Sequence, residues 1–304
     1  MVSFCKKRRR RLNFARFSQA RRGLTRFQSA HFATRAKAIS FCKRKPRPLN
    51  IVVYADLPRL EERRLSDDSI MKNALWASGA IATAALAYAV RGRSATLLAD
   101  SVYHGVRSRP AIALTFDDGP SESTPALLEI LDRLKVPATF FQCGANVRRL
   151  PGISRQVLAA GHEIGNHSDT HPYFCLRSPA MMRRELARAQ AAIEEATGVR
   201  PRLFRAPYGV RWFGLRAVQR QLDLLGVMWT SIGVDWKLPS DRIVTRLLRG
   251  AGNGAIFCLH DGRLLQPRPD IRPTLDAARL VVPALIDRGF HFEKISDILC
   301  PTKN

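Results

Sequence analysis

Residues that can do acid–base or metal chemistry follow the apolar, β-prone runs from Pro110 onward. Asp117 and Asp118 stand in TFDDGP, and His167 and His171 stand in NHSDTH. One carboxylate and two imidazoles suffice to hold a catalytic zinc-like ion with a position left for water. Such an ion acidifies its water toward neutrality, and neighbouring carboxylates on an extended backbone point in different directions. One Asp can therefore bind the ion while the other acts as a base.

Further polar residues follow later runs of the same kind. Arg205 and Tyr208 stand in FRAPYG, Asp235 and Trp236 follow the next run, and His260 stands in LHDG. A histidine on the opposite side of the rim can protonate a leaving amine. Taken singly, each cluster has a plain structural interpretation: a turn, an ion pair, a core residue or barrel packing. Their order on successive runs favours an amide hydrolase.

The elements that must position these residues alternate from Pro110 onward. Short strands followed by longer helices predict an α/β protein with a mainly parallel sheet, in a closed or nearly closed barrel. Chemistry is then expected at the carboxyl ends of the strands. The predicted strands are 111–116, 138–143, 162–165, 203–205, 225–230, 255–259 and 290–292. The predicted helices are 124–135, 147–160, 179–197, 212–223, 240–250 and 273–288.

Five motifs, TFDDGP, HSDTH, RAPYG, VDW and LHD, occur in this order. They resemble the five motifs of the polysaccharide deacetylase family, also called the NodB-homology or carbohydrate esterase 4 family. The resemblance covers residues 110–300, including the phrases ATFF, GHEIGNH and TGVRPRLFRAP. It implies a distorted (β/α) barrel of about seven strands. It also implies metal-dependent removal of N-acetyl groups from glycans that contain N-acetylglucosamine, such as peptidoglycan, chitin-like polymers or exopolysaccharide.

The resemblance also implies a role for each matching residue. Asp118, His167 and His171 would bind a divalent metal, commonly Zn²⁺, with Co²⁺ or Mn²⁺ as substitutes. Asp117 would be the general base and His260 the general acid. The partner of such an enzyme is an acetylated amino-sugar glycan.

Four more residues would support this chemistry. Arg205 would keep the base ionised and aimed, and Asp235 would pair with the acid and raise its proton affinity. The backbone N–H of Tyr208 would stabilise the oxyanion. Trp236 would wall the acetyl pocket.

The sequence departs from the family pattern at two motifs. Ile232 stands where the fourth motif usually begins with Asp, and Cys258-Leu259 replace the usual pair of leucines before the histidine of the fifth. We expect Cys258 and Leu259 to contact substrate, with the shorter Cys258 enlarging the acyl pocket. A metal-dependent amidase acting on a non-carbohydrate C–N bond and an inactive glycan-binding relative stay open as alternatives. The intact base, acid and metal ligands argue against the inactive relative.

The beginning of the chain differs in composition from the rest. Residues 1–70 hold 19 Lys and Arg against 5 Asp and Glu, which is +14 of the total formal charge of +25. This stretch has no sustained apolar period, so we expect it to be unfolded. A tail that binds phosphates without sequence preference competes with the hypothesis that translation starts at Met71 and that 1–70 is not part of the native protein. No specific nucleic-acid partner is predicted.

The stretch from 71 to 93 has the layout of a signal peptide or membrane anchor. A lysine precedes an uncharged run over 74–90, arginines close it, and Ala87-Tyr88-Ala89 fits a cleavage site. The alternative is an Ala-rich helix packed on the domain. Residues 94–109 are expected to be a linker. The prediction is therefore export to the periplasm or the extracellular space, with or without retention in the inner membrane.

The overall composition excludes some classes of protein. With 304 residues and 46% apolar content, the chain can build a packed core and is not disordered as a whole. Its six cysteines form no CxxC pair, so the sequence predicts neither a zinc knuckle nor a thioredoxin-type site. Their redox state stays open.

Overall fold

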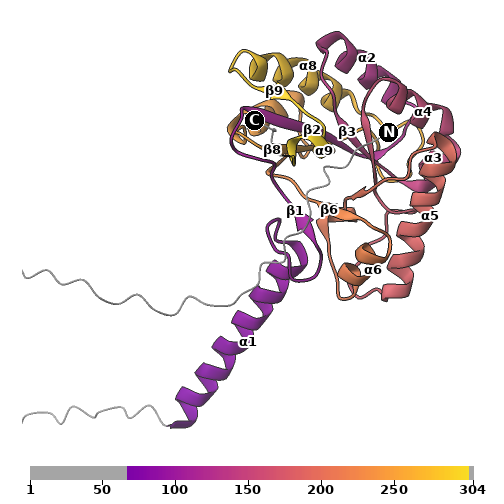
Figure 1. The fold of residues 1–304 in the computed structure, drawn as a ribbon. Coiled ribbons are helices and arrows are strands. Elements are labelled where there is room, and N and C mark those ends of the chain that lie inside the picture. Colours follow the sequence, from indigo (N-terminus) through magenta and orange to yellow (C-terminus); the bar gives the residue numbers. More distant parts are fainter. Residues whose placement is uncertain (1–66, 301–304) are drawn as a thin grey trace, which may run out of the picture. The chain divides into compact units, whose positions relative to one another are not determined.

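A computed structural model describes residues 67–300, and the expectations for the basic region up to residue 66 lie outside this description, as do residues 301–304. From Lys72 onward the described residues belong to one unit. Strands and helices alternate along it, as the sequence predicts (Figure 1).

The described residues contain nine strands in one sheet, and all of its pairings are parallel. The order is β1-β6-β5-β4-β3-β2-β8-β7, and β9 pairs with the beginning of β2. Within the described part β1 and β7 are end strands without a mutual pairing, so the sheet is an open, distorted barrel. The strands are β1 (Ser101–Val102), β2 (Ala111–Gly119), β3 (Thr139–Gln142), β4 (Glu163–Asn166), β5 (Leu203–Phe204), β6 (Leu225–Val227), β7 (Ser231–Ile232), β8 (Ala255–His260) and β9 (His291–Phe292).

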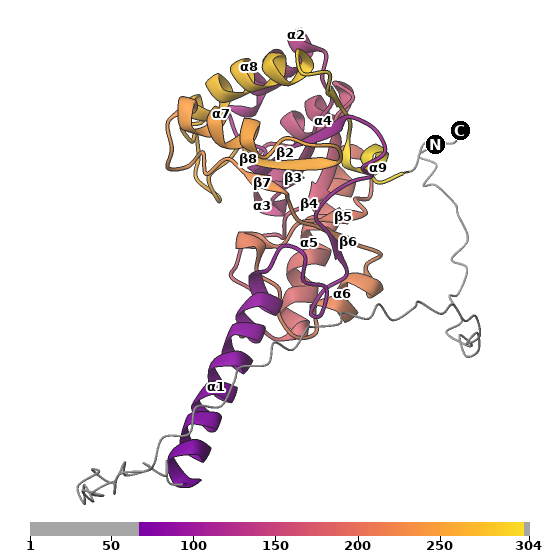
Figure 2. The same cartoon turned by 90° about the vertical axis from the view of Figure 1, so that its left-hand side faces the viewer.

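Helices cover the sheet, with α2, α7 and α8 grouped over the strands β2 and β8 (Figure 2). The predicted helix 147–160 is two helices, because Pro151 starts a new one after Leu150. The short elements β1, β7 and α9 were not predicted, since so few residues show no period. The helices are α1 (Asp67–Arg91), α2 (Thr124–Leu134), α3 (Gly144–Arg149), α4 (Pro151–Ala159), α5 (Pro179–Thr197), a 3-10 turn (Pro207–Gly209), α6 (Leu215–Gln221), α7 (Ser240–Arg249), α8 (Arg272–Ile286) and α9 (Ile295–Ile298).

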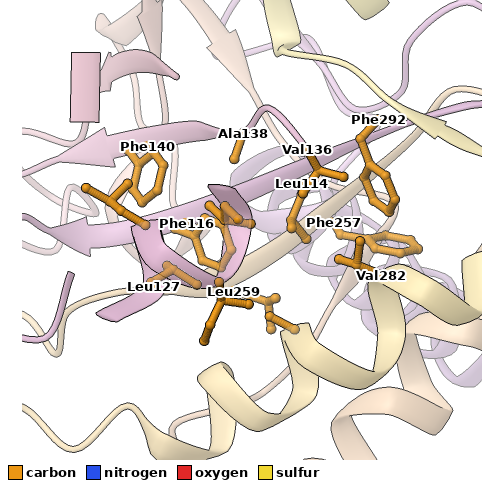
Figure 3. Packing of buried hydrophobic residues seen from close by; sticks show 14 of the residues in the cluster. Leu114, Phe116, Leu127, Val136, Ala138, Phe140, Phe257, Leu259, Val282 and Phe292 are labelled. Atoms are coloured by element: carbon orange, nitrogen blue, oxygen red, sulfur yellow. The ribbon is translucent and has the colours of Figure 1, made fainter. Parts of the chain in front are cut away.

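The central strand β2 is buried along its whole length, as expected for a parallel strand with both faces covered. Ile112, Leu114 and Phe116 belong to the largest core cluster, together with side chains of α2 and α8 (Figure 3). Successive side chains of a strand point to opposite faces. Thr115 and Asp117 therefore face the other side of the sheet.

The neighbouring strand β8 shows the same alternation. Phe257 and Leu259 belong to the same core cluster (Figure 3). Cys258 and His260 alternate with them and face the other side. In the parallel register between the two strands Asp117 lies opposite His260. β2 and β8 therefore bring their polar residues to one side of the sheet and to the same end.

Residues 94–109, predicted to be a linker, are part of the folded domain. Leu98 and Ala99 are buried in the second core cluster, and β1 extends the sheet beside β6. The buried guanidinium of Arg211 donates to the carbonyl oxygen of Ala95 at 2.8 Å. The domain thus begins before its first predicted strand.

The helix α1 is exposed over most of its length. It is the one helix in the described residues that is long and apolar enough to cross a membrane, over Ile70–Arg91, and 11% of that apolar window is buried. Trp76 and Ile81 are 79% and 70% exposed. Ala89 and Val90 in the last turn are buried in the second core cluster. Only the end of α1 is packed, which does not support the alternative of a helix packed on the domain throughout.

Candidate metal centre and active site

Three potential metal ligands converge at the ends of β2 and β4. Asp118 Oδ1 lies 3.3 Å from His167 Nε2 and 3.2 Å from His171 Nε2, and all three side chains are buried. Asp118 Oδ1 has no hydrogen-bond partner among the described residues, which is costly for a buried carboxylate oxygen unless a cation neutralises it. Ligand atoms about 2.0–2.1 Å from a tetrahedral ion lie about 3.3 Å apart. These residues therefore fit a divalent metal.

The charge of Asp118 suits a metal ligand. Burial by itself would raise the pKa of this carboxyl. The adjacent imidazoles of His167 and His171 outweigh burial and hold the pKa well below its usual range. Asp118 is therefore ionised at neutral pH.

The ring of His167 is oriented by the strand beside it. Its Nδ1 lies 2.8 Å from the carbonyl oxygen of Arg205, at the end of β5. A carbonyl oxygen only accepts, so in the neutral ring Nδ1 carries the hydrogen and Nε2 presents its lone pair to Asp118. This is the tautomer that a metal-binding histidine needs.

The backbone of Asp118 turns its side chain into the site. In a regular strand it would point to the same face as Phe116, but its φ is +72° and the strand register shifts here. Its Oδ2 accepts from the N–H of Leu264 at 2.9 Å, and its carbonyl oxygen accepts from Asn146 Nδ2 at 2.8 Å. A Cβ on Gly262 would lie 2.3 Å from that carbonyl oxygen. Sequence reasoning missed these three supporting residues, although the glycine of LHDG was a signal for the last.

The loop that carries both ligand histidines is held by α5. Glu185 accepts from the backbone N–H groups of Asp169 and Thr170 at 3.1 and 2.8 Å. Ser168 Oγ accepts from the N–H of His171 at 3.1 Å, and both of these residues have positive φ. Glu185 lies in the first half of α5, and no motif reveals its role. The loop conformation therefore depends on a contact that the sequence alone did not indicate.

Asp117 is fixed by a fully buried arginine. Its Oδ1 accepts from Arg205 Nη1 at 2.7 Å, and the same nitrogen lies 2.6 Å from Thr115 Oγ1. Arg205 Nε donates to the carbonyl oxygen of Val227 at 3.0 Å, and the guanidinium carbon lies 4.2 Å from the ring centroid of Phe141. With Oδ1 held in this way, Oδ2 is the oxygen of Asp117 left for proton transfer.

His260 is paired with Asp235 on the opposite side of the site. His260 Nδ1 lies 2.8 Å from Asp235 Oδ1, and Asp235 Oδ2 accepts from the His260 N–H and from Thr274 Oγ1 at 2.9 and 2.5 Å. Burial would lower the pKa of His260, but the charge and hydrogen bond of Asp235 outweigh it and raise the pKa to about 9. His260 is therefore protonated at neutral pH and can donate a proton from Nε2.

One cavity of about 790 Å³ is lined by Asp117, Asp118, His167, His171 and His260, whereas Arg205 and Asp235 lie behind its wall. Tyr208, with φ +56°, and Trp236 are about half exposed at its wall, and their rings contact His171 and His260 respectively. Ile232 supplies an apolar wall. The cavity also includes Arg91 of α1, which sequence reasoning did not assign to the site, and Arg263 of the loop after β8.

The structure corrects one predicted substrate contact. Cys258 lines the cavity, but Leu259 is fully buried in the core cluster on the other side of β8 (Figure 3). The cause is the alternation of side chains along a strand. Because His260 faces the cavity, its immediate neighbour cannot.

Comparison with known proteins agrees with this geometry. A family model described as polysaccharide deacetylase matches residues 104–227. A chitooligosaccharide deacetylase from Bradyrhizobium sp. (strain ANU 289) is 36% identical over 205 residues, which are 64% of this chain and 94% of that relative. The chain belongs to the polysaccharide deacetylase family.

Two further relatives of this polysaccharide deacetylase are similar to it in sequence or in structure. The peptidoglycan N-acetylglucosamine deacetylase PgdA of Listeria monocytogenes is 38% identical over 157 residues, 51% of this chain and 33% of the relative. A crystal structure of a peptidoglycan N-acetylglucosamine deacetylase matches with a TM-score of 0.62 and 27% identity, covering 66% of this chain and 94% of that one. The predicted family and fold are confirmed, and the family's metal dependence agrees with the group of Asp118, His167 and His171.

Proposed function

We propose that this chain is an exported, metal-dependent deacetylase that removes N-acetyl groups from glycans containing N-acetylglucosamine. One observation carries the proposal. The three-ligand group around Asp118 lies in the same cavity as a buried carboxylate, Asp117, and a protonated histidine, His260. A metal site, a base and an acid around one cavity are the parts that amide hydrolysis requires.

Asp118, His167 and His171 would hold the metal. One carboxylate oxygen and two imidazole nitrogens would suit Zn²⁺, and Co²⁺ or Mn²⁺ would substitute. When bound, the ion supplies a Lewis acid that lowers the pKa of water and polarises the acetamide carbonyl.

The side chains of this chain carry the proton transfers. Asp117 takes a proton from the attacking water while Arg205 keeps its other oxygen fixed. The N–H of Tyr208 donates to the developing oxyanion. As the C–N bond breaks, His260 gives its proton to the leaving amine, and Asp235 stabilises the charged ring beforehand. The products are acetate and the free amino sugar.

The substrate class is proposed from the relatives and from the cavity wall. The relatives named above act on chitooligosaccharide or peptidoglycan according to their names. The half-exposed rings of Tyr208 and Trp236 offer apolar faces to a sugar, and Ile232 and Cys258 offer a small apolar wall to the methyl group of the acetyl. These contacts favour a sugar over a non-carbohydrate amide.

Acetate release by the full chain, purified in detergent and loaded with Zn²⁺, tests the function. Chitooligosaccharides, peptidoglycan, acetylated xylan and simple acetamides are compared, each with and without a chelator. We expect chelator-sensitive release from at least one of the two N-acetylglucosamine polymers. Release from simple acetamides but from none of the glycans would favour the amidase alternative, and no release from any substrate would favour the inactive relative.

The same proposal assigns the part of α1 from Met71 onward as a retained membrane anchor, with residues 1–70 outside the native protein. The exposed apolar side chains of this helix are suited to contact with lipid. Its last turn, at Ala89 and Val90, is buried in the domain, so cleavage between these two residues would remove part of the packed core. Membrane fractionation and mass spectrometry of the native N-terminus test this. A peptide from within residues 1–60 contradicts the start at Met71, and a mature N-terminus at Val90 contradicts the anchor.

A further inference from the structure

A second group of potential metal ligands lies beside the first. The ligand atoms of Asp117, Cys258 and His260 all lie within 4.8 Å of one another. They come from β2 and β8, which pair directly, and they face the same cavity. The mechanism proposed above uses the carboxylate and the imidazole but gives the thiol no chemical role.

Each member of this group has one atom available. Asp117 Oδ1 is held by Arg205, and Oδ2 accepts from Cys258 Sγ at 3.4 Å. His260 Nδ1 is held by Asp235, which leaves Nε2. One oxygen, one sulfur and one nitrogen therefore meet with orientations fixed by buried partners, which is how metal ligands are normally supported.

We infer that Asp117, Cys258 and His260 form a second, inhibitory metal site that takes a thiophilic divalent cation such as excess Zn²⁺ or Cd²⁺. Thiolate, imidazole and carboxylate together are a set that Zn²⁺ binds well, and the cavity leaves room for water as a fourth ligand. The cation replaces two protons, that of the Cys258 thiol and that on His260 Nε2, and both leave as H⁺. The sulfur then coordinates as thiolate and the imidazole as the neutral ring. Binding of the cation to this second site does not depend on the proposed function, whereas inhibition by the cation does.

The two sites share no ligand atom, so an ion in one takes no ligand from the other. Asp117 Oδ2 of the second group lies 3.9 Å from His167 Nε2 of the first. A cation in the second site ties up the carboxylate that takes a proton and the imidazole that gives one, and so stops turnover without removing the first ion.

The cysteine is what distinguishes this cavity. The family pattern has leucine at position 258, and a leucine side chain offers no ligand atom. The site therefore follows from one departure of this sequence from that pattern. Burial raises the pKa of the Cys258 thiol well above its usual value, so without a metal the thiol is neutral and unreactive.

Deacetylation is measured across a series of buffered free Zn²⁺ concentrations. For the full chain we expect activity to rise as the first site fills and to fall again at higher Zn²⁺. In Cys258→Ser and Cys258→Leu the zinc concentration for half-inhibition should rise by at least about tenfold, because loss of even an outer partner of a metal often costs that much affinity. Inhibition is expressed relative to each variant's own maximum. Cys175→Ser, a partly buried cysteine outside the cavity, should keep the inhibition of the original chain.

Cadmium gives a readout that needs no turnover. Titrating Cd²⁺ into the zinc-loaded full chain should add an ultraviolet thiolate-to-cadmium band that Cys258→Ser lacks and Cys175→Ser retains. An equal band in Cys258→Ser, or zinc inhibition unchanged in that variant, overturns the second site. The full chain could show the predicted cadmium bands but no deacetylation at any zinc concentration. That result would contradict the proposed function and still support the second metal site.

Discussion

Arg205 and Asp117 form an ion pair at 2.7 Å in which both side chains are almost wholly buried. Breaking a buried pair from one side leaves an uncompensated charge and costs about 3–5 kcal/mol. We expect Arg205→Met to lower the free energy of unfolding by about that much. Chemical denaturation, carried out after a chelator has removed bound metal, measures this free energy of unfolding.

The double variant Asp117→Asn/Arg205→Met checks the cause. Because it removes both charges together, it should be destabilised by less than the sum of the two single changes. Simple additivity would mean that the two side chains do not stabilise each other. Exposed Arg279→Met, with its ion pair to Asp276 at the surface, should change stability little.

Asp117→Asn tests the base. The change keeps the shape of the side chain but removes its ability to take a proton, so kcat should fall by about 10²–10⁴-fold. The metal content should stay that of the original chain, because the three ligands are untouched. Turnover at the original rate would show that another group accepts the proton.

His167→Ala and His171→Ala test the metal ligands. Each removes one of three protein ligands, so after dialysis we expect less than one metal ion per chain and little activity. Elemental analysis of the dialysed protein gives the ratio. His291→Ala, at an exposed position far along the chain from the cavity, is the matched control and should retain the metal. Full metal retention in both site variants would remove the basis of the assignment.

The pH dependence tests the pair of His260 and Asp235. The pKa of His260 is raised to about 9, so the acid is protonated below that pH, and kcat/KM should decline as the pH rises through it. Asp235→Asn removes the charge that raises this pKa while the burial that lowers it remains. The alkaline decline should therefore move to lower pH. Exposed Asp270→Asn should leave the profile in place, and an unmoved profile in Asp235→Asn would mean that His260 is not the titrating acid.

The longer strands and the order of the motifs could be predicted from the sequence, because such a strand is a short apolar run that ends at a polar cluster. Leu114 and Phe116 mark β2 in this way, and Asp117 marks its end. The burial of Leu259 in the core could also have been predicted, because neighbouring side chains of a strand point to opposite faces and His260 faces the cavity. Leu259 was expected to contact substrate because it stands in the motif beside His260, and the alternation of side chains along the strand was not applied to it.

Other features had no local signal. The positive φ of Asp118 is imposed by contacts with Asn146 and Leu264, which come from other parts of the chain. The inclusion of 94–109 in the domain depends on bonds such as that from Arg211 to Ala95, 116 positions apart. Long-range contacts of this kind are decided by the folded shape and leave no period or motif behind.

The last residue of α1, Arg91, belongs to the wall of the catalytic cavity. If this helix is embedded in lipid, no flexible linker separates the bilayer from the catalytic cavity. The reach of the enzyme would then be set by the protein itself, and glycan lying against the membrane would be processed before strands farther out. Its place of action would be decided by where its helix ends.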